Sequence, residues 1–328
     1  MRRREFLALV AALGAGGWPQ LLRAEPVTGK IGYLHPVTIN PSHITFSLLQ
    51  REWRRLGYVD GETVFARSGD DDPHLLPKLV EELIDHGVGV LIVVGADAVR
   101  AAAKTTAAVP IVAIDMETDP VQTGLIGSYA RPGGNVTGLF LDMPALATKW
   151  IELMREMVPA LDRIAFAWQP STGRSQLDVA LGAAKTLNIE ATVLEFDISD
   201  DFAASLSNLA GPKRTGIIQL TFPGISTVAE KFAAAAELYR LPAMSFLRVA
   251  AKGGFLMSYG PGQEEYFPRA VQIADRILRG DKVANVPIER PSKFEFVVNL
   301  RTARALGLAV PPTLLARADE VIELKADV

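Results

Sequence analysis

Residues 88–116 read VGVLIVVGADAVRAAAKTTAAVPIVAIDM and contain the pattern that decides the fold. The first run, VGVLIVVG (88–95), places apolar and β-branched residues at consecutive positions, which is typical of a strand buried on both faces. An Ala-rich segment over 98–108 predicts a helix, and VPIVAIDM (109–116) predicts a second strand. A strand, a helix and a strand in this order form a βαβ unit of a parallel sheet.

The same alternation continues on both sides of this stretch. Toward the N-terminus the sequence predicts strands over 30–34 and 62–68 and helices over 42–57 and 75–87. The segment 120–134 breaks the rhythm with two prolines and the pair Gly133-Gly134. Beyond it, further strands are expected over 163–169, 191–197, 216–222, 242–247, 253–260 and 293–299, with helices starting near 173, 199, 226 and 264. The chain is therefore expected to form two doubly wound α/β lobes.

The first 24 residues have the layout of an export signal. Three arginines at positions 2–4 precede an apolar run from Phe6 to Trp18, too short for the roughly 20 residues of a membrane span, and a segment ending at Ala24. Arg3-Arg4 followed by Glu5-Phe6-Leu7 resembles a twin-arginine signal, although the general secretion route stays open. We expect removal after Ala24 and a periplasmic location. An N-terminal membrane helix and a cytosolic start are the alternatives.

Charge and cysteine content exclude several classes of partner. The 34 basic and 37 acidic residues fall to 30 and 36 when the leader's four arginines and one glutamate are removed, a net charge of about −6. Such a chain attracts neither nucleic acid nor anionic lipid. It has no cysteine, so neither disulfides nor a lipid-modified N-terminal cysteine are expected, and no other run of 18 apolar residues suggests stable membrane insertion.

No pattern in the sequence predicts catalysis, a cofactor or a metal ion. The four histidines are scattered, and without cysteine they suggest no zinc site. The glycines of ARPGGNVTG (130–138) lack the Lys-Ser/Thr of a phosphate loop and precede a strand, and Ser258 has no histidine downstream to act as its base. The run Asp70-Asp71-Asp72 fits a solvated turn better than a calcium loop. We therefore expect no enzyme, although Asp115, Glu117 and Asp119, at the end of the strand predicted over 109–116, could either do acid–base work or hold a ligand's ammonium group.

Several longer segments resemble one known family. They are LGYVDGE (56–62), DPVQTGLIGSYARPGGNVTGL (119–139), GGFLMSYGP (253–261), ADRILRG (274–280) and KFEFVVNLRTARALGLAVPPTLLARADEVIE (293–323). Together with the leader and KIGYL (30–34), they resemble the solute-binding proteins of ABC transporters of the tryptophan/tyrosine type over nearly the whole chain. The resemblance implies capture of a small polar solute, an amino acid or an aromatic metabolite, for import through an inner-membrane permease by a soluble monomer.

The resemblance also implies a type I periplasmic-binding fold, in which two flavodoxin-like lobes with parallel sheets are joined by three hinge crossings. On this basis residues 28–142 and 257–284 form the N-terminal lobe, and residues 143–256 and 285–328 form the C-terminal lobe. The crossings are expected in the Pro- and Gly-bearing segments 132–138, 259–262 and 287–291. Two alternatives stay open: a periplasmic sensor feeding a membrane receptor, and an enzyme on the same fold.

In such lobes the ligand lies at the carboxyl ends of the strands. This rule selects candidate binding residues in both lobes: Pro36, Val37, Asn40, Gly95, Ala96, Asp97, Asp115, Glu117, Gln169, Ser171, Thr172, Thr221, Phe222, Phe246 and Arg248. For an amino acid, Asp115 or Glu117 would hold the ammonium group. Ser171 and Thr172, or Arg248, would hold the carboxylate, and Trp168, Phe222, Phe246 or Tyr259 the side chain. Asp97 departs from relatives that commonly carry Gly-Thr there, and it would repel a carboxylate or pair with a cation.

Overall fold

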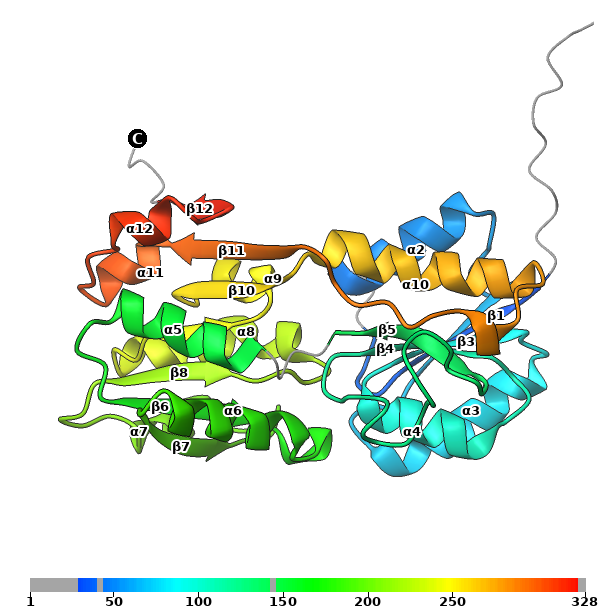
Figure 1. Ribbon diagram of the computed structural model, residues 1–328, viewed down its shortest axis with the longest axis horizontal. Helices are drawn as coiled ribbons and strands as arrows, with labels where there is room; N and C mark the ends of the chain where they lie inside the picture. The colour runs from blue at the N-terminus through cyan, green and yellow to red at the C-terminus, as the bar shows by residue number, and fades with distance from the viewer. Residues whose placement is uncertain (1–28, 40–43, 142–145, 324–328) are drawn as a thin grey trace, which may run out of the picture.

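The computed structural model describes residues 29–39, 44–141 and 146–323, which form two α/β lobes lying side by side (Figure 1). The leader and Asn40 lie outside these residues. Each lobe is built on a sheet with helices on both faces, as the sequence predicts. The two-lobed α/β architecture that the sequence predicts is therefore confirmed.

The first lobe contains a five-stranded parallel sheet of order β2-β1-β3-β4-β5. The strands are β1 (Ile31–His35), β2 (Val64–Ser68), β3 (Val90–Val94), β4 (Ile111–Asp115) and β5 (Val136–Phe140). The helices are α2 (Ile44–Arg55), η1 (Pro73–Leu75), α3 (Leu76–Asp85), α4 (Ala96–Thr105) and α10 (Gln263–Leu278).

Both faces of this first sheet are buried. Alternate residues of β3 belong to different apolar clusters: Ile92 to the cluster that includes residues of α2 and α10, and Leu91 to the one that includes residues of α3 and α4. Figure 1 shows these helices on the two faces of the sheet. Every residue of β3 and β4 is buried, which is why these strands are continuous apolar runs in the sequence.

The second lobe contains a seven-stranded sheet of order β12-β11-β10-β9-β8-β6-β7. The strands are β6 (Arg163–Trp168), β7 (Glu190–Glu195), β8 (Thr215–Gln219), β9 (Ala243–Ser245), β10 (Met257–Pro261), β11 (Phe294–Asn299) and β12 (Glu320–Ile322). The helices are α5 (Ala147–Met157), η3 (Pro170–Thr172), α6 (Ser175–Thr186), α7 (Phe202–Ser207), α8 (Ile225–Leu238), α9 (Arg248–Lys252), α11 (Leu300–Ala305) and α12 (Pro312–Leu315). All pairs are parallel except β10 with β11, which is antiparallel.

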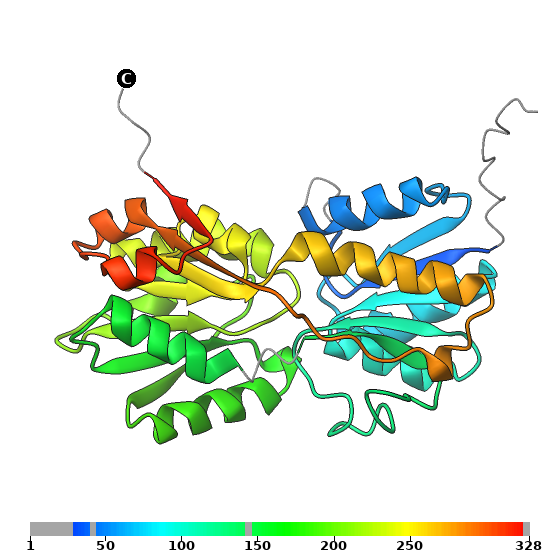
Figure 2. The ribbon, with the colours of Figure 1, turned by 45° about the horizontal axis from the view of Figure 1, so that its top comes forward.

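The strand β10 belongs to the second sheet, whereas the sequence assigned residues from 257 onward to the first lobe. Its backbone pairs with β9 on one side and β11 on the other. The helix that follows, α10, packs on α2, β3 and β4 of the first lobe. The chain therefore changes lobes after Pro261, at the start of α10, as Figure 2 shows.

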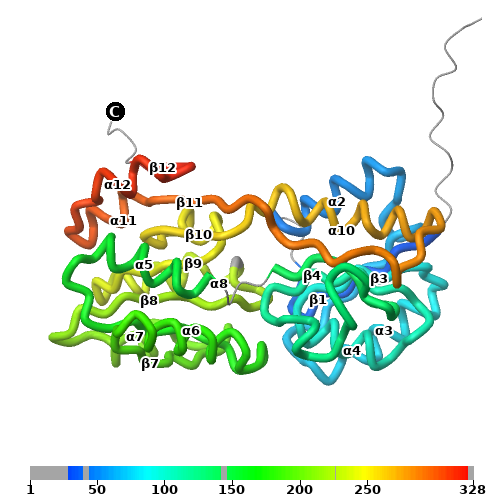
Figure 3. Tube along the Cα trace, viewed as in Figure 1, coloured from blue at the N-terminus to red at the C-terminus, as the bar shows by residue number. Residues whose placement is uncertain are grey.

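Two other segments connect the lobes. One leads from β5 in the first lobe to α5 in the second, so the chain changes lobes beyond the expected segment 132–138. The other follows η4 (Val283–Asn285) and leads into β11 (Figure 3). In this last segment the Glu289 backbone pairs with β5, donating to the Gly138 carbonyl at 2.9 Å and accepting from Phe140 N at 3.1 Å. The third crossing is thus held along the edge of the first sheet.

Candidate functional site

The carboxyl ends of the parallel strands of both sheets meet between the lobes and line two neighbouring cavities. One has a volume of about 560 Å³ and is lined mainly by apolar side chains; we call it the apolar compartment. The other has a volume of about 790 Å³ and contains four carboxylates; we call it the acidic compartment. Both are lined by residues of both lobes, so they form a divided interlobe cleft.

A direct contact between the lobes divides this cleft. Val37 of the first lobe and Pro223 of the second line both compartments. Gly95, at φ +83°, approaches Pro223 so closely that a Cβ atom on residue 95 would lie 2.7 Å from the proline Cγ. A side chain at residue 95 would push the lobes apart, so the glycine permits this degree of closure.

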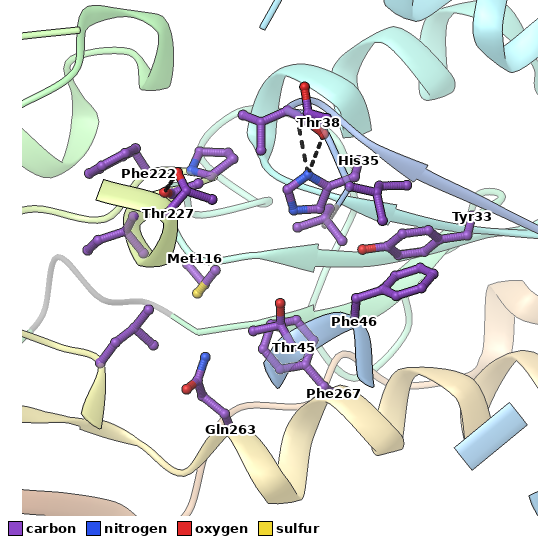
Figure 4. Close-up of a pocket in the computed structure, with 17 residues that line it drawn as sticks. Tyr33, His35, Thr38, Thr45, Phe46, Met116, Phe222, Thr227, Gln263 and Phe267 are labelled. Atoms are coloured by element: carbon purple, nitrogen blue, oxygen red, sulfur yellow. Dashed lines mark hydrogen bonds between the residues drawn. The ribbon is translucent and has the colours of Figure 1, made fainter. Parts of the chain in front are cut away.

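The apolar compartment is enclosed by aromatic side chains from several elements (Figure 4). Tyr33, Phe46 and Phe267 line it from β1, α2 and α10, and Phe222 lines it from the loop after β8. In Figure 4 the Tyr33 hydroxyl points into this space, and burial raises the pKa of the phenol, which therefore stays protonated. Gln263, at the start of α10, is buried with no hydrogen-bond partner for its Nε2 atom. The compartment thus offers an apolar surface with a few polar groups.

The acidic compartment is lined by carboxylates of both lobes. Asp71, Asp97 and Glu117 belong to the first lobe and Asp197 to the second, and none of the described residues lining this compartment is basic. Burial raises the pKa of Asp97, an effect that its ion pair with Arg100 offsets in part. Its remaining lining residues are Pro36, Val37, Pro73, Leu76, Ala96, Gln169, Ser171, Thr172 and Pro223.

Glu117 is the most deeply buried of these carboxylates. Its Oε2 atom accepts a hydrogen bond from the Ala96 backbone N–H at 3.2 Å, at the N-terminus of α4, whereas Oε1 has no partner. Burial raises the pKa of Glu117 well above its ordinary value, and the nearby charge of Asp115 raises it further. A buried carboxylate oxygen without a partner costs folding free energy, unless a ligand supplies the missing donor.

Asp115 has a different environment from Glu117, although both follow β4. Its carboxylate accepts hydrogen bonds from Glu117 N at 2.8 Å, Thr118 N at 3.0 Å and the Thr118 hydroxyl at 2.5 Å. The side chain is 1 % exposed and lines neither compartment. Asp115 therefore holds the turn that presents Glu117 to the cleft.

A buried glutamine fixes the second-lobe wall of the acidic compartment. Gln176 of α6 donates through Nε2 to the Thr172 hydroxyl at 2.8 Å and to the Thr221 carbonyl at 2.6 Å. Its Oε1 atom accepts from Thr221 N at 2.9 Å and from the Thr221 hydroxyl at 2.7 Å. These bonds hold the ends of β6 and β8 in one arrangement before any ligand binds.

Most of the candidate residues from the sequence lie at or beside this cleft. The acidic compartment is lined by Pro36, Val37, Ala96, Asp97, Glu117, Gln169, Ser171 and Thr172, and the apolar compartment by Val37 and Phe222. Thr221 and Phe246 are buried and line neither compartment. Of the expected aromatic contacts Trp168 and Tyr259, neither lines a compartment.

Arg248 lies elsewhere. It faces a separate surface hollow, where its guanidinium forms ion pairs with Glu264, with Glu295 at 3.9 Å and with Glu320 at 3.5 Å. The prediction that Arg248 receives a ligand carboxylate therefore finds no support in its position. The sequence placed this residue correctly after β9 but could not indicate the direction of its side chain.

Several lining residues were not predicted from the sequence. Asp71 was assigned to a solvated turn, and Asp197 was passed over although it follows β7 as Gln169 follows β6. Tyr33 lies within β1, Phe46 within α2, and Gln263 at the start of α10, where the chain crosses between the lobes. The rule that ligands bind at strand ends would have selected Asp71 after β2 and Asp197 after β7; nothing in the local sequence indicates Tyr33, Phe46 or Gln263.

Two α/β lobes that meet over a divided cleft, with a buried and unpartnered carboxylate facing it, define a two-lobed solute-binding protein. The sequence profile described as ABC transporter substrate binding protein matches residues 46–322. The chain belongs to this family, and its fold is the type I periplasmic-binding fold. Within the described ranges no helix is long and apolar enough to span a membrane, and no cluster of three or more His, Asp or Glu side chains is arranged to hold a metal ion.

Known proteins similar to this chain include binders of aromatic amino acids. A tyrosine-binding protein from Clostridioides difficile strain R20291 is 24 % identical over 284 residues, which are 83 % of this chain and 77 % of that protein. The crystal structure of an ABC domain from Streptococcus pneumonia in complex with L-Trp has a TM-score of 0.79 at 20 % identity, covering 89 % of this chain and 100 % of that one. A conserved domain protein from Vibrio cholerae has a TM-score of 0.80 at 21 % identity, covering 90 % and 99 %.

Proposed function

We propose that this protein is exported to the periplasm, captures a small solute that carries an amino group between its lobes, and delivers it as a monomer to an ABC permease in the inner membrane. The solutes are amino acids and aromatic metabolites with an amino group. Membership of the substrate-binding family supports the transport role. The observation that carries the ligand class is the Oε1 atom of Glu117, a buried acceptor without a partner at the wall of the interlobe cleft.

The two compartments suit the two ends of such a solute. Met116 lines the apolar compartment and Glu117 the acidic one, so the compartments flank the end of β4. An ammonium group that donates to Glu117 gains a charge-assisted hydrogen bond in a site shielded from water. An apolar or aromatic group would pack among Tyr33, Phe222 and Phe267 on the other side.

The cleft is built for binding rather than for chemistry. The carboxylate of Asp115 is occupied by three hydrogen-bond donors. No histidine lines the acidic compartment, and its one lining serine, Ser171, is exposed. The lining residues therefore supply no buried serine or histidine that could form a general-base and nucleophile pair with Glu117. We therefore propose that the solute leaves the cleft unchanged.

The test is a thermal-shift and calorimetric screen of the protein purified after export. A solute present at 100 times its dissociation constant should stabilise the protein by about 2.7 kcal/mol. Glu117→Gln should abolish the response, and Glu81→Gln, a matched change at an exposed position of α3, should preserve it. Chemical change of a bound solute, or binding that is insensitive to Glu117→Gln, would contradict the proposal. The intact mass should correspond to loss of residues 1–24, and retention of the leader would contradict periplasmic release.

A further inference from the structure

Most of the carboxyl groups that line the acidic compartment have no cationic partner among the described residues. Of its four carboxylates, Asp97 forms an ion pair with Arg100, one turn further along α4. Asp71, Glu117 and Asp197 form no ion pair within the described part of the chain. Three carboxylates therefore line this compartment without a cationic partner, and one of them, Glu117, is fully buried with an unpartnered oxygen.

Two of these carboxylates, Asp71 and Asp197, line the compartment from different lobes. Asp71 lies in the loop after β2 and Asp197 follows β7 of the other lobe. Burial raises the pKa of Asp71, and the charge of Asp197 raises it further, whereas hydrogen bonds from Ser199 lower the pKa of Asp197. Like charges that meet across a cleft repel each other, and a cation between them removes this penalty.

Several donors at or beside the acidic compartment are already engaged in hydrogen bonds within the protein. The Ala96 N–H at the start of α4 already donates to Glu117. On the second lobe the Thr172 hydroxyl donates to the Gln169 carbonyl at 2.8 Å, and the Thr221 N–H donates to Gln176. A carboxylate entering here would meet the negative groups of Asp71 and Asp197, and these three donors could bind it only by giving up their present hydrogen bonds.

We infer that the acidic compartment selects organic cations, so that the preferred solutes are primary amines without a carboxylate group rather than zwitterionic amino acids. This inference rests on the proposed function of the cleft and narrows it. A protonated amine stabilises the ionised form of Glu117, which burial disfavours in the ligand-free site, and it relieves the repulsion between Asp71 and Asp197. The amino acid with the same side chain gains the same interaction but also brings its own carboxylate close to these negative groups. Its binding should therefore be weaker than that of the amine by about tenfold or more.

Matched pairs of compounds that differ only in the carboxylate test this directly. Isothermal titration calorimetry of the exported protein at pH 7 would compare tryptamine with tryptophan, tyramine with tyrosine, and cadaverine with lysine. We expect at least one amine to bind, and every amine that binds to do so at least about tenfold more tightly than its amino acid. Tighter binding of the amino acids would overturn this inference and leave the proposed function intact. If no compound binds, both fail.

Two variants test whether Asp197 and Glu117 cause the preference for amines over amino acids. Asp197→Asn changes an exposed side chain at the mouth of the cleft and should reduce the preference for the amine over the amino acid by about tenfold, without loss of folding. Glu117→Gln should reduce binding of the amine by about 100-fold. Glu81→Gln serves as the control for the charge change. An amine preference that is unchanged in Asp197→Asn and Glu117→Gln would overturn the assignment to this compartment.

Discussion

Replacing Glu117 by glutamine should make the ligand-free protein more stable, and the gain should increase with pH. The Glu117 carboxyl is buried, faces the buried carboxylate of Asp115 and receives one hydrogen bond, from Ala96 N. The other ionisable group near it is the Tyr266 phenol on α10, whose own pKa is raised by burial and by the Glu117 charge. A neutral amide keeps an acceptor for the Ala96 N–H and removes the charge.

The sign and size of the pH effect follow from proton linkage. The pKa of Glu117 is raised in the folded protein, so the folded state holds a proton that the unfolded state has already released above about pH 4.5. The contribution of Glu117 to the stability of the wild type should therefore fall by about 1.4 kcal/mol for each pH unit from there up to its raised pKa, and stay level beyond it. Glu117→Gln removes this loss from the profile.

Urea unfolding of both proteins at pH 5, 6, 7 and 8, followed by circular dichroism, measures the difference in unfolding free energy. Glu81→Gln on the exposed side of α3 is the control, because it makes the same substitution at a solvated site. The difference between wild type and Glu117→Gln should widen as the pH rises from 5. A difference that does not change with pH, or a wild type that is the more stable protein at pH 8, would refute the description of Glu117 as a desolvated carboxyl that folding disfavours.

Two further substitutions test neighbouring features. Asp115→Ala leaves two backbone N–H groups and the Thr118 hydroxyl without their acceptor, and it should lower the unfolding free energy by about 2–4 kcal/mol in the same urea assay. A loss below about 1 kcal/mol would show that the turn after β4 does not depend on the Asp115 carboxylate. Gly95→Ala should weaken binding of the best solute about tenfold in calorimetry, because its Cβ would meet Pro223 across the cleft. Gly61→Ala, also at positive φ but with no atom within 4 Å of the added Cβ, should leave affinity unchanged, and equal losses in both variants would exclude the interlobe contact as the cause.

The fold was predictable where a strand is a continuous run of apolar residues in the sequence. In β3 and β4 every residue is buried, so the run of Val and Ile indicates both the strand and its place inside a parallel sheet. The position of β10 was not predictable in the same way. Its sequence predicts a strand, but nothing local indicates which of two sheets it joins, since that depends on long-range pairing with β9 and β11.

The site was predictable in its location and less so in its details. The rule that ligands bind at strand ends selects both Asp115 and Glu117, which are two residues apart. Only the folded turn shows that the Asp115 carboxylate accepts hydrogen bonds from backbone N–H groups, whereas Glu117 Oε1 has no partner. Gln176 lies within a helix with no unusual pattern, so its role in holding two strand ends could not be read from the sequence. The ligand contacts themselves stay predictions.

The place of α10 in the first lobe has a consequence for how the protein is made. This helix covers one face of β3 and β4, yet it is encoded after β6, β7, β8, β9 and β10 of the other sheet. The first lobe can therefore complete its core only when residue 278 has left the ribosome. By then the residues of five of the seven strands of the second sheet have been synthesised. The lobe that begins first in the chain is therefore completed only after most of the second sheet has been synthesised.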